Sequence, residues 1–209
     1  MKLRSLSAGV TLFAFVLVAS TPSVLAGKKG SDSDVLMEVV GAVFNASPSA
    51  SIQYGYLSYV NGLDSVFSGN PQNETTALLT FFSDTQTVRV INNGPLRVVN
   101  RVGTFTIFLD NAPNGDFSNP DSFRDGTPVL TGLLRHQVIL NTSTNTFTTV
   151  FVITVTSANP FRIGSQGLWF GQPGQKIRLI VSGQASTSGP GQFVIAGYAT
   201  GGNNVVIED

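Results

Sequence analysis

Residues 109–126 read LDNAPNGDFSNPDSFRDG, and they gather four aspartates in a segment whose prolines and glycines oppose regular structure. The whole chain has twelve Asp and Glu side chains, so this segment is where carboxylate chemistry is most concentrated. Carboxylate and amide oxygens are the ligands that Ca²⁺ takes in proteins. From residue 111 to 127 there is no strand pattern, and loops of this length are usually functional or disordered.

The stretch 110–121 can be laid on the twelve-residue calcium-loop template. Its third position is Ala112, which has no side-chain ligand, and no helices flank it, so it is not an EF-hand. Asn and Asp also cap turns by bonding to their own backbone, which is the competing interpretation. Calcium is the one cofactor that the sequence suggests, with the candidate ligands Asp110, Asn114, Asp116 and Asp121.

His136 is the single histidine of the chain. In an extended strand it shares a face with Leu134, Val138 and Leu140, so its side chain is expected to point inward. One interpretation is a general base or a ligand-orienting group in a cavity, with a pKa lowered by burial. The other is a core histidine bonded to a backbone carbonyl. The sequence shows no nucleophile motif, and one imidazole without a thiolate argues against catalytic zinc.

Aromatic side chains provide the remaining candidates for ligand binding. Tyr54 and Tyr56 point the same way on a strand, with Gly55 between them, and could form a platform for a sugar or an aromatic ligand. Packing is the alternative, because glycine beneath large rings often marks a close contact in a sheet. Trp169 lies in a glycine-rich connection. The predicted ligand-binding residues are thus His136, Tyr54, Tyr56 and Trp169.

The N-terminus has the pattern of a secretory signal peptide. Lys2 and Arg4 precede an apolar run, and Val24 and Ala26 suit a signal-peptidase site. The run is well short of the roughly 20 apolar residues that span a bilayer. We therefore expect a signal peptide over residues 1–26, a flexible leader over 27–34, and a secreted (extracellular or periplasmic) all-β domain over 35–209 without a transmembrane segment.

Composition excludes several classes of function. Cysteine is absent, which rules out disulfide scaffolds, thiol catalysis and thiolate metal sites. Charged residues make up 11% of the chain, against about 25% in ordinary globular proteins. Basic and acidic residues balance, and cleavage after Ala26 would remove two basic ones, so no basic surface is available for nucleic acid.

Apolar residues alternate with polar ones in about ten short segments. The clearest is residues 145–157, where Phe147, Thr149 and Phe151 share one face. A polar turn joins it to residues 129–140, which predicts a long hairpin. In the sequence VINNGPL we expect the turn at Asn92-Asn93. Further strands are predicted over 35–44, 51–60, 75–83, 86–91, 96–100, 103–110, 176–183 and 192–200.

Many antiparallel strands without helices leave two architectures, a closed barrel or a two-sheet β-sandwich. Short connections favour a single up-and-down β-barrel of about 8–10 strands. Closure also removes edge strands, which a surface so poor in charge would protect badly. The sandwich remains the alternative.

Three functions are compatible with these residues. The preferred one is a secreted, non-catalytic barrel that binds a small molecule or glycan, with calcium as a potential stabiliser. The first alternative is an isomerase or hydrolase that uses carboxylates and His136. The second is a structural or adhesive surface protein that associates with itself, as the low charge and threonine-rich strand faces suggest.

Overall fold

Eight antiparallel strands close into a barrel, which confirms the predicted architecture and sets the sandwich aside. A computed structural model describes residues 35–185, 192–202 and 204–207; the expected signal peptide and leader lie outside this part. The barrel strands are β1 (Val35–Phe44), β2 (Ala50–Val60), β3 (Leu79–Asn93), β4 (Leu96–Leu109), β5 (Thr127–Asn141), β6 (Thr146–Ala158), β9 (Lys176–Ala185) and β10 (Gln192–Thr200).

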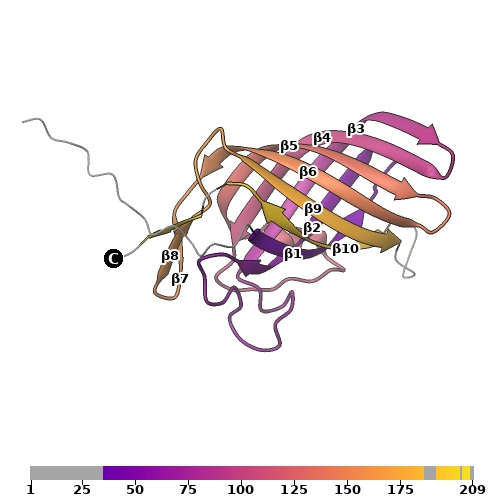
Figure 1. The fold of residues 1–209 in the computed structure, drawn as a ribbon. Helices are drawn as coiled ribbons and strands as arrows, with labels where there is room; N and C mark the ends of the chain where they lie inside the picture. Colours follow the sequence, from indigo (N-terminus) through magenta and orange to yellow (C-terminus); the bar gives the residue numbers. More distant parts are fainter. Residues whose placement is uncertain (1–34, 186–191, 203, 208–209) are drawn as a thin grey trace, which may run out of the picture.

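The barrel has an up-and-down order, because neighbouring barrel strands also follow one another along the chain. β1 pairs with both β2 and β10, so the sheet closes without a free edge (Figure 1). The described residues form no α-helix and one short 3-10 helix, η1 (Pro120–Phe123). No helix in this part of the chain has the length and apolarity that crossing a membrane requires.

A second, three-stranded sheet lies at one end of the barrel (Figure 1). Its strands are β7 (Phe161–Ile163), β8 (Gln166–Trp169) and β11 (Val205–Ile207), none of which the sequence pattern predicted. Phe161, Leu168 and Phe170 from this region belong to the same hydrophobic core as the barrel interior. This end is therefore packed with side chains, while the tips of the β3–β4 and β5–β6 hairpins lie at the other end.

Side-chain alternation places the core inside the barrel. On β6, Phe147, Thr149, Phe151 and the following alternate residues are buried, as the sequence predicted. Phe81 and Phe105 stack in the interior with ring centroids 5.7 Å apart. Branched and aromatic side chains fit this pleated surface well, which explains why they form strands here.

β3 and β4 are longer than the sequence pattern suggested. Each was predicted as two short strands, but they run unbroken for 15 and 14 residues. The predicted turn at Asn92-Asn93 was wrong, because Asn93 pairs with Leu96 and the turn is Gly94-Pro95. Gly94 has a φ of 57°, and glycine tolerates this conformation at the first central position of a hairpin turn. Pro95 then needs no ladder hydrogen bond.

Candidate ligand-binding cavity

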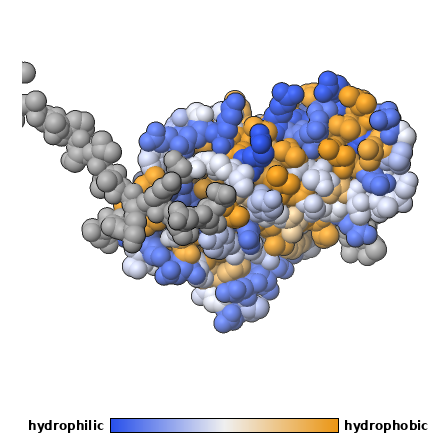
Figure 2. All heavy atoms as spheres, viewed as in Figure 1, coloured by the Kyte–Doolittle hydropathy of each residue, from blue (hydrophilic) through white to orange (hydrophobic). Residues whose placement is uncertain are grey.

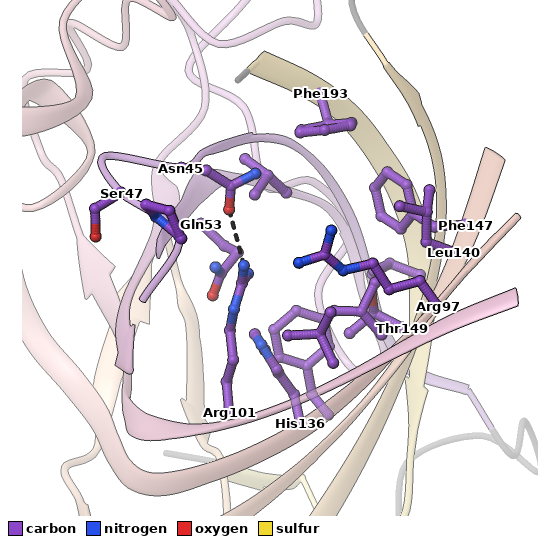
Figure 3. A pocket seen from close by; sticks show the side chains of 16 residues that line it. Asn45, Ser47, Gln53, Arg97, Arg101, His136, Leu140, Phe147, Thr149 and Phe193 are labelled. Carbon is purple, nitrogen blue, oxygen red and sulfur yellow. Dashed lines mark hydrogen bonds between the residues drawn. The ribbon is translucent and has the colours of Figure 1, made fainter. Parts of the chain in front are cut away.

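A cavity of about 450 Å³ lies inside the barrel, at the end where β1 leads into β2 and β3 into β4 (Figure 3). Pockets for small molecules usually have volumes of roughly 300–1,000 Å³. An eight-stranded barrel is wide enough to hold one small ligand. Most lining residues are apolar: Val43, Pro48, Val99, Val138, Leu140, Phe147, Phe151, Val181 and Phe193. The polar ones are Asn45, Ser47, Gln53, Arg97, Arg101, His136 and Thr149.

Strand register stacks much of this lining in three rows across β4, β5 and β6. Every second residue of a strand points into the barrel, and the inward side chains of paired residues lie side by side on neighbouring strands. The innermost row is buried, whereas Arg97 in the outermost row is exposed. From the interior to the mouth, the rows read Arg101–His136–Phe151, Val99–Val138–Thr149 and Arg97–Leu140–Phe147.

His136 points into the barrel, as the sequence predicted, and its side chain is 2% exposed. Its ring meets that of Phe151 edge to face, with centroids 5.0 Å apart. Neither Nδ1 nor Nε2 has a hydrogen-bond partner, so this is not a core histidine bonded to a carbonyl. Burial first, and then the charge of Arg101, lower the pKa of His136 to about 3, so the imidazole is neutral at physiological pH.

Arg101 lies directly opposite His136 in the β4–β5 pairing and is 9% exposed. Its Nε donates to Oγ1 of Thr87 over 3.1 Å, and its Nη2 donates to Oδ1 of Asn45 over 3.0 Å. Both acceptors are neutral. Burial, followed by the nearby charge of Arg97, lowers the pKa of the Arg101 guanidinium. The cavity therefore holds a buried cation whose described partners carry no charge.

Gln53 brings a polar network to the wall of the cavity formed by β2 and β3. Its Oε1 accepts a hydrogen bond from the Ser83 hydroxyl, and its Nε2 donates to Ser51 Oγ over 2.7 Å and to Thr85 Oγ1 over 3.4 Å. All four side chains are buried. Because both ends of the amide are satisfied, this network is a fixed part of the wall rather than a group awaiting a ligand.

Tyr54 and Tyr56 do point the same way, but they lie on the outer face of the barrel. We call the group they belong to the outer cluster: Tyr54, Tyr56, Ala77, Phe82 and Phe123, with Phe117 and other partly buried residues against it. Tyr54 packs on Phe123 with centroids 5.4 Å apart, and its hydroxyl donates to the carbonyl of Phe117 over 3.1 Å.

Gly55 allows this arrangement. A Cβ at that position would come within 2.5 Å of the Gly41 Cα on the neighbouring strand, so the close contact expected beneath the two tyrosines is confirmed. The segment 110–126 covers the outer cluster, since Phe117 and Phe123 both come from it. The structure thus does not bring either tyrosine together with His136.

Two of the aspartates in this segment cap turns. Oδ1 of Asp110 accepts the backbone N–H of Ala112 over 2.9 Å. Asp116 accepts both the backbone N–H and the hydroxyl of Ser118, over 2.8 and 2.7 Å, and these bonds lower its pKa. Such local bonds are what Asp makes in turns without any metal. Oδ2 of Asp110 is buried and has no partner.

Two further pairs of side chains in the segment bond to each other. Asn114 Nδ2 donates to Asp125 Oδ2 over 2.9 Å, and Asp121 forms an ion pair with Arg124 over 2.7 Å. Among the described residues, no three His, Asp or Glu side chains are placed to hold one metal ion. Calcium binding by Asp110, Asn114, Asp116 and Asp121 stays a prediction of the sequence.

Trp169 ends β8 in the small sheet and is half-buried. Its Nε1 is buried without a hydrogen-bond partner. The small sheet lies at the packed end of the barrel, so Trp169 does not line the cavity that His136 lines. Of the four predicted ligand-binding residues, His136 alone is in the cavity lining.

Sequence reasoning missed the two arginines of the cavity. Arg97, Val99 and Arg101 share one face of β4, because they occupy alternate positions. A signal was present, since Phe105 and Ile107 continue the same alternation into the core. It was missed because the pattern was divided at residue 101, and because charged side chains are placed outside by default.

Comparisons of the chain with protein-family models, with curated proteins and with solved structures gave no significant match.

Proposed function

We propose that this chain is a secreted, non-catalytic barrel that binds one small, largely apolar molecule in its cavity. The observation that carries the proposal is the cavity of about 450 Å³, whose lining is mostly aliphatic and aromatic. Concave apolar pockets with a few placed polar groups are the usual form of small-molecule sites. The signal-peptide pattern of residues 1–26 supports secretion.

Binding is favoured over catalysis by the composition of the lining. The enzyme alternative requires a carboxylate close to His136, and none of the described residues lining the cavity is Asp or Glu. A single neutral imidazole without a partner does not make a catalytic set. A glycan is also less favoured than an apolar molecule, because Tyr54 and Tyr56 are buried beneath the segment 110–126.

A neutral dye tests the proposal. N-Phenyl-1-naphthylamine fluoresces more strongly in apolar surroundings, and we expect it to bind the purified chain at one site per molecule. Val138→Phe would fill the middle of the cavity and abolish this binding. Ile139→Phe is the matched control, because Ile139 is the next residue on β5 and is exposed. It should bind the dye as the natural chain does.

Thermal unfolding shows whether each variant is folded. If Val138→Phe does not fold, Val181→Phe fills the same cavity from β9. Dye binding that survives both filling variants would place the dye elsewhere and contradict the proposal. The proposal would be overturned if the natural chain bound neither N-phenyl-1-naphthylamine nor the sulfonated form of this dye.

Self-association is the second candidate, because apolar side chains remain exposed on the outer face of the barrel (Figure 2). Val102 on β4 and Leu133 on β5 are 42% and 60% exposed. They are diagonal neighbours, because Val102 pairs with Arg135, two residues after Leu133. Light scattering across protein concentration tests it. A mass that grows with concentration and returns to the monomer value in Leu133→Glu would support association, whereas a constant monomer mass would contradict it.

A further inference from the structure

Five of the seven polar lining residues come from the β1–β2 connection, β2 and β4, so the cavity is more polar on that side, and this asymmetry bears on the chemistry of its ligand. Asn45, Gln53, Arg97 and Arg101 come from the β1–β2 connection, β2 and β4. The facing wall, from β5, β6, β9 and β10, is mainly aliphatic and aromatic (Figure 3). A ligand that matches both walls has an apolar body and one polar group. This inference rests on the proposed function, since it concerns the same cavity.

Arg101 makes the polar wall positively charged. It is 9% exposed, and no carboxylate among the described residues lies within ion-pair distance of it. Its two hydrogen bonds go to the neutral oxygens of Thr87 and Asn45. A guanidinium has five N–H donors, so further donors remain for a ligand. Burying a charge without a counter-charge is costly, and a bound anion would offset that cost.

Two more groups strengthen the preference for an anion. The Arg97 side chain turns into the same space as Arg101 (Figure 3), and the two like charges repel. His136 lies opposite Arg101, and both of its ring nitrogens are buried and unpartnered. Buried polar atoms without a partner require an explanation, and a neutral imidazole can donate one hydrogen bond to an anion.

We propose that the cavity binds a small amphiphilic carboxylate, whose carboxylate lies against the guanidinium groups of Arg101 and Arg97 and whose apolar body lies against Val138, Phe147 and Phe193. A guanidinium matches a carboxylate with two parallel N–H donors, which gives a strong and directional bond. The ring N–H of His136 supplies a further donor from the innermost row.

Two dyes with the same ring system separate charge from apolar contact. 8-Anilinonaphthalene-1-sulfonate is N-phenyl-1-naphthylamine with one added sulfonate. We expect the natural chain to bind the sulfonate at least about tenfold more tightly, as for one charge-assisted bond in a buried site. Decanoate and decanol then test the carboxylate itself. Decanoate should displace either dye at a concentration about tenfold lower than decanol does.

Variants assign the effect to the cavity. Arg101→Met keeps an unbranched apolar stem but removes the guanidinium and its charge, and it should abolish the advantage of the sulfonate dye while leaving the neutral dye bound. Arg135→Met is the matched control, because Arg135 is on β5 next to His136 in sequence and is exposed. It removes the same charge from the outer face and should leave both affinities unchanged. Arg97→Met should reduce the advantage by a smaller factor, because Arg97 is exposed.

The outcomes separate this proposal from the proposed function. Equal affinities for the two dyes in the natural chain, or an advantage that Arg101→Met leaves intact, would overturn anion recognition while the apolar site stands. An advantage for the sulfonate dye without one for decanoate over decanol would overturn the carboxylate. Absence of binding by both dyes would overturn the proposed function as well. If Arg101→Met does not fold, the decanoate and decanol comparison decides without any mutation.

Discussion

Arg101 and His136 are cross-strand neighbours in the β4–β5 pairing, and both side chains line the cavity inside the barrel. The pair consists of a buried cation and a buried neutral imidazole, with no carboxylate among the described residues that line the cavity. The charge of Arg101 helps to keep His136 unprotonated. We therefore expect this pair to affect the pH dependence of stability and the response of the His136 pKa to ligands.

The free energy of unfolding should decrease as the pH is lowered, because of His136. Its pKa in the folded chain is about 3, below its ordinary value of 6.5, so the unfolded chain binds the proton more readily between these values. The stabilisation is complete above pH 6.5 and is lost progressively as the pH falls toward 3. The slope approaches about 1.4 kcal/mol per pH unit. Arg101 and Arg97 are the charged groups that line the cavity together with His136.

Urea unfolding between pH 6.5 and 4.5 measures this effect. His136→Gln and His136→Leu carry no titrating group, so their unfolding free energies should fall less steeply than that of the natural chain. All three proteins have the same carboxylates, so a difference between their profiles is specific to His136. Parallel pH profiles would show that the imidazole does not titrate as its burial implies.

Ligand charge should change the pKa of His136. A carboxylate beside Arg101 adds a negative charge close to the imidazole, which favours its protonated form and raises its pKa. Because the chain has one histidine, its ring signals can be followed by NMR without ambiguity. Saturating decanoate should raise the pKa, whereas decanol should not. An equal response to both would mean that the carboxylate lies away from His136.

The outer cluster should hold the segment 110–126 on the barrel. Phe123 is fully buried, so Phe123→Ala should destabilise the chain by about 3–5 kcal/mol. Phe117 is half-buried, and Phe117→Ala should cost less. Tyr54→Phe removes the hydrogen bond to the Phe117 carbonyl, at a cost of about 1 kcal/mol. Denaturant unfolding ranks the three variants, and equal effects for Phe123→Ala and Phe117→Ala would contradict this packing.

The aspartates of the segment 110–126 should stabilise it as turn caps, with or without calcium. Asp110 and Asp116 already accept bonds from the local backbone, so excess calcium and chelator should give the same melting temperature. If the segment held a calcium site, calcium at a hundred times the dissociation constant would instead raise the free energy of unfolding by about 2.7 kcal/mol. A rise with calcium that Asp110→Ala and Asp121→Ala both abolish would establish the metal site.

Local pattern was sufficient to predict much of the barrel. β1 and β10 have the predicted bounds, and the buried face of β6 is the predicted one, because period-two alternation records which side of a strand meets the core. His136 was placed inward by the same rule. The β3–β4 turn was predicted wrongly, because the choice between neighbouring turn positions depends on the register of two long strands rather than on one dipeptide.

The amino-acid sequence by itself determined that this chain forms strands, that it lacks thiol chemistry and that His136 points inward. Only the tertiary structure decided which side chains share a cavity. Arg101 and His136 are far apart along the chain, and they meet because β4 and β5 pair in one particular register. Tyr54 and Tyr56 lie on the other side of the barrel sheet from Arg101 and His136. Alternate residues of a barrel strand point to the interior and to the outer face. Closure of the sheet, which no local pattern encodes, turned alternation into an inside and an outside.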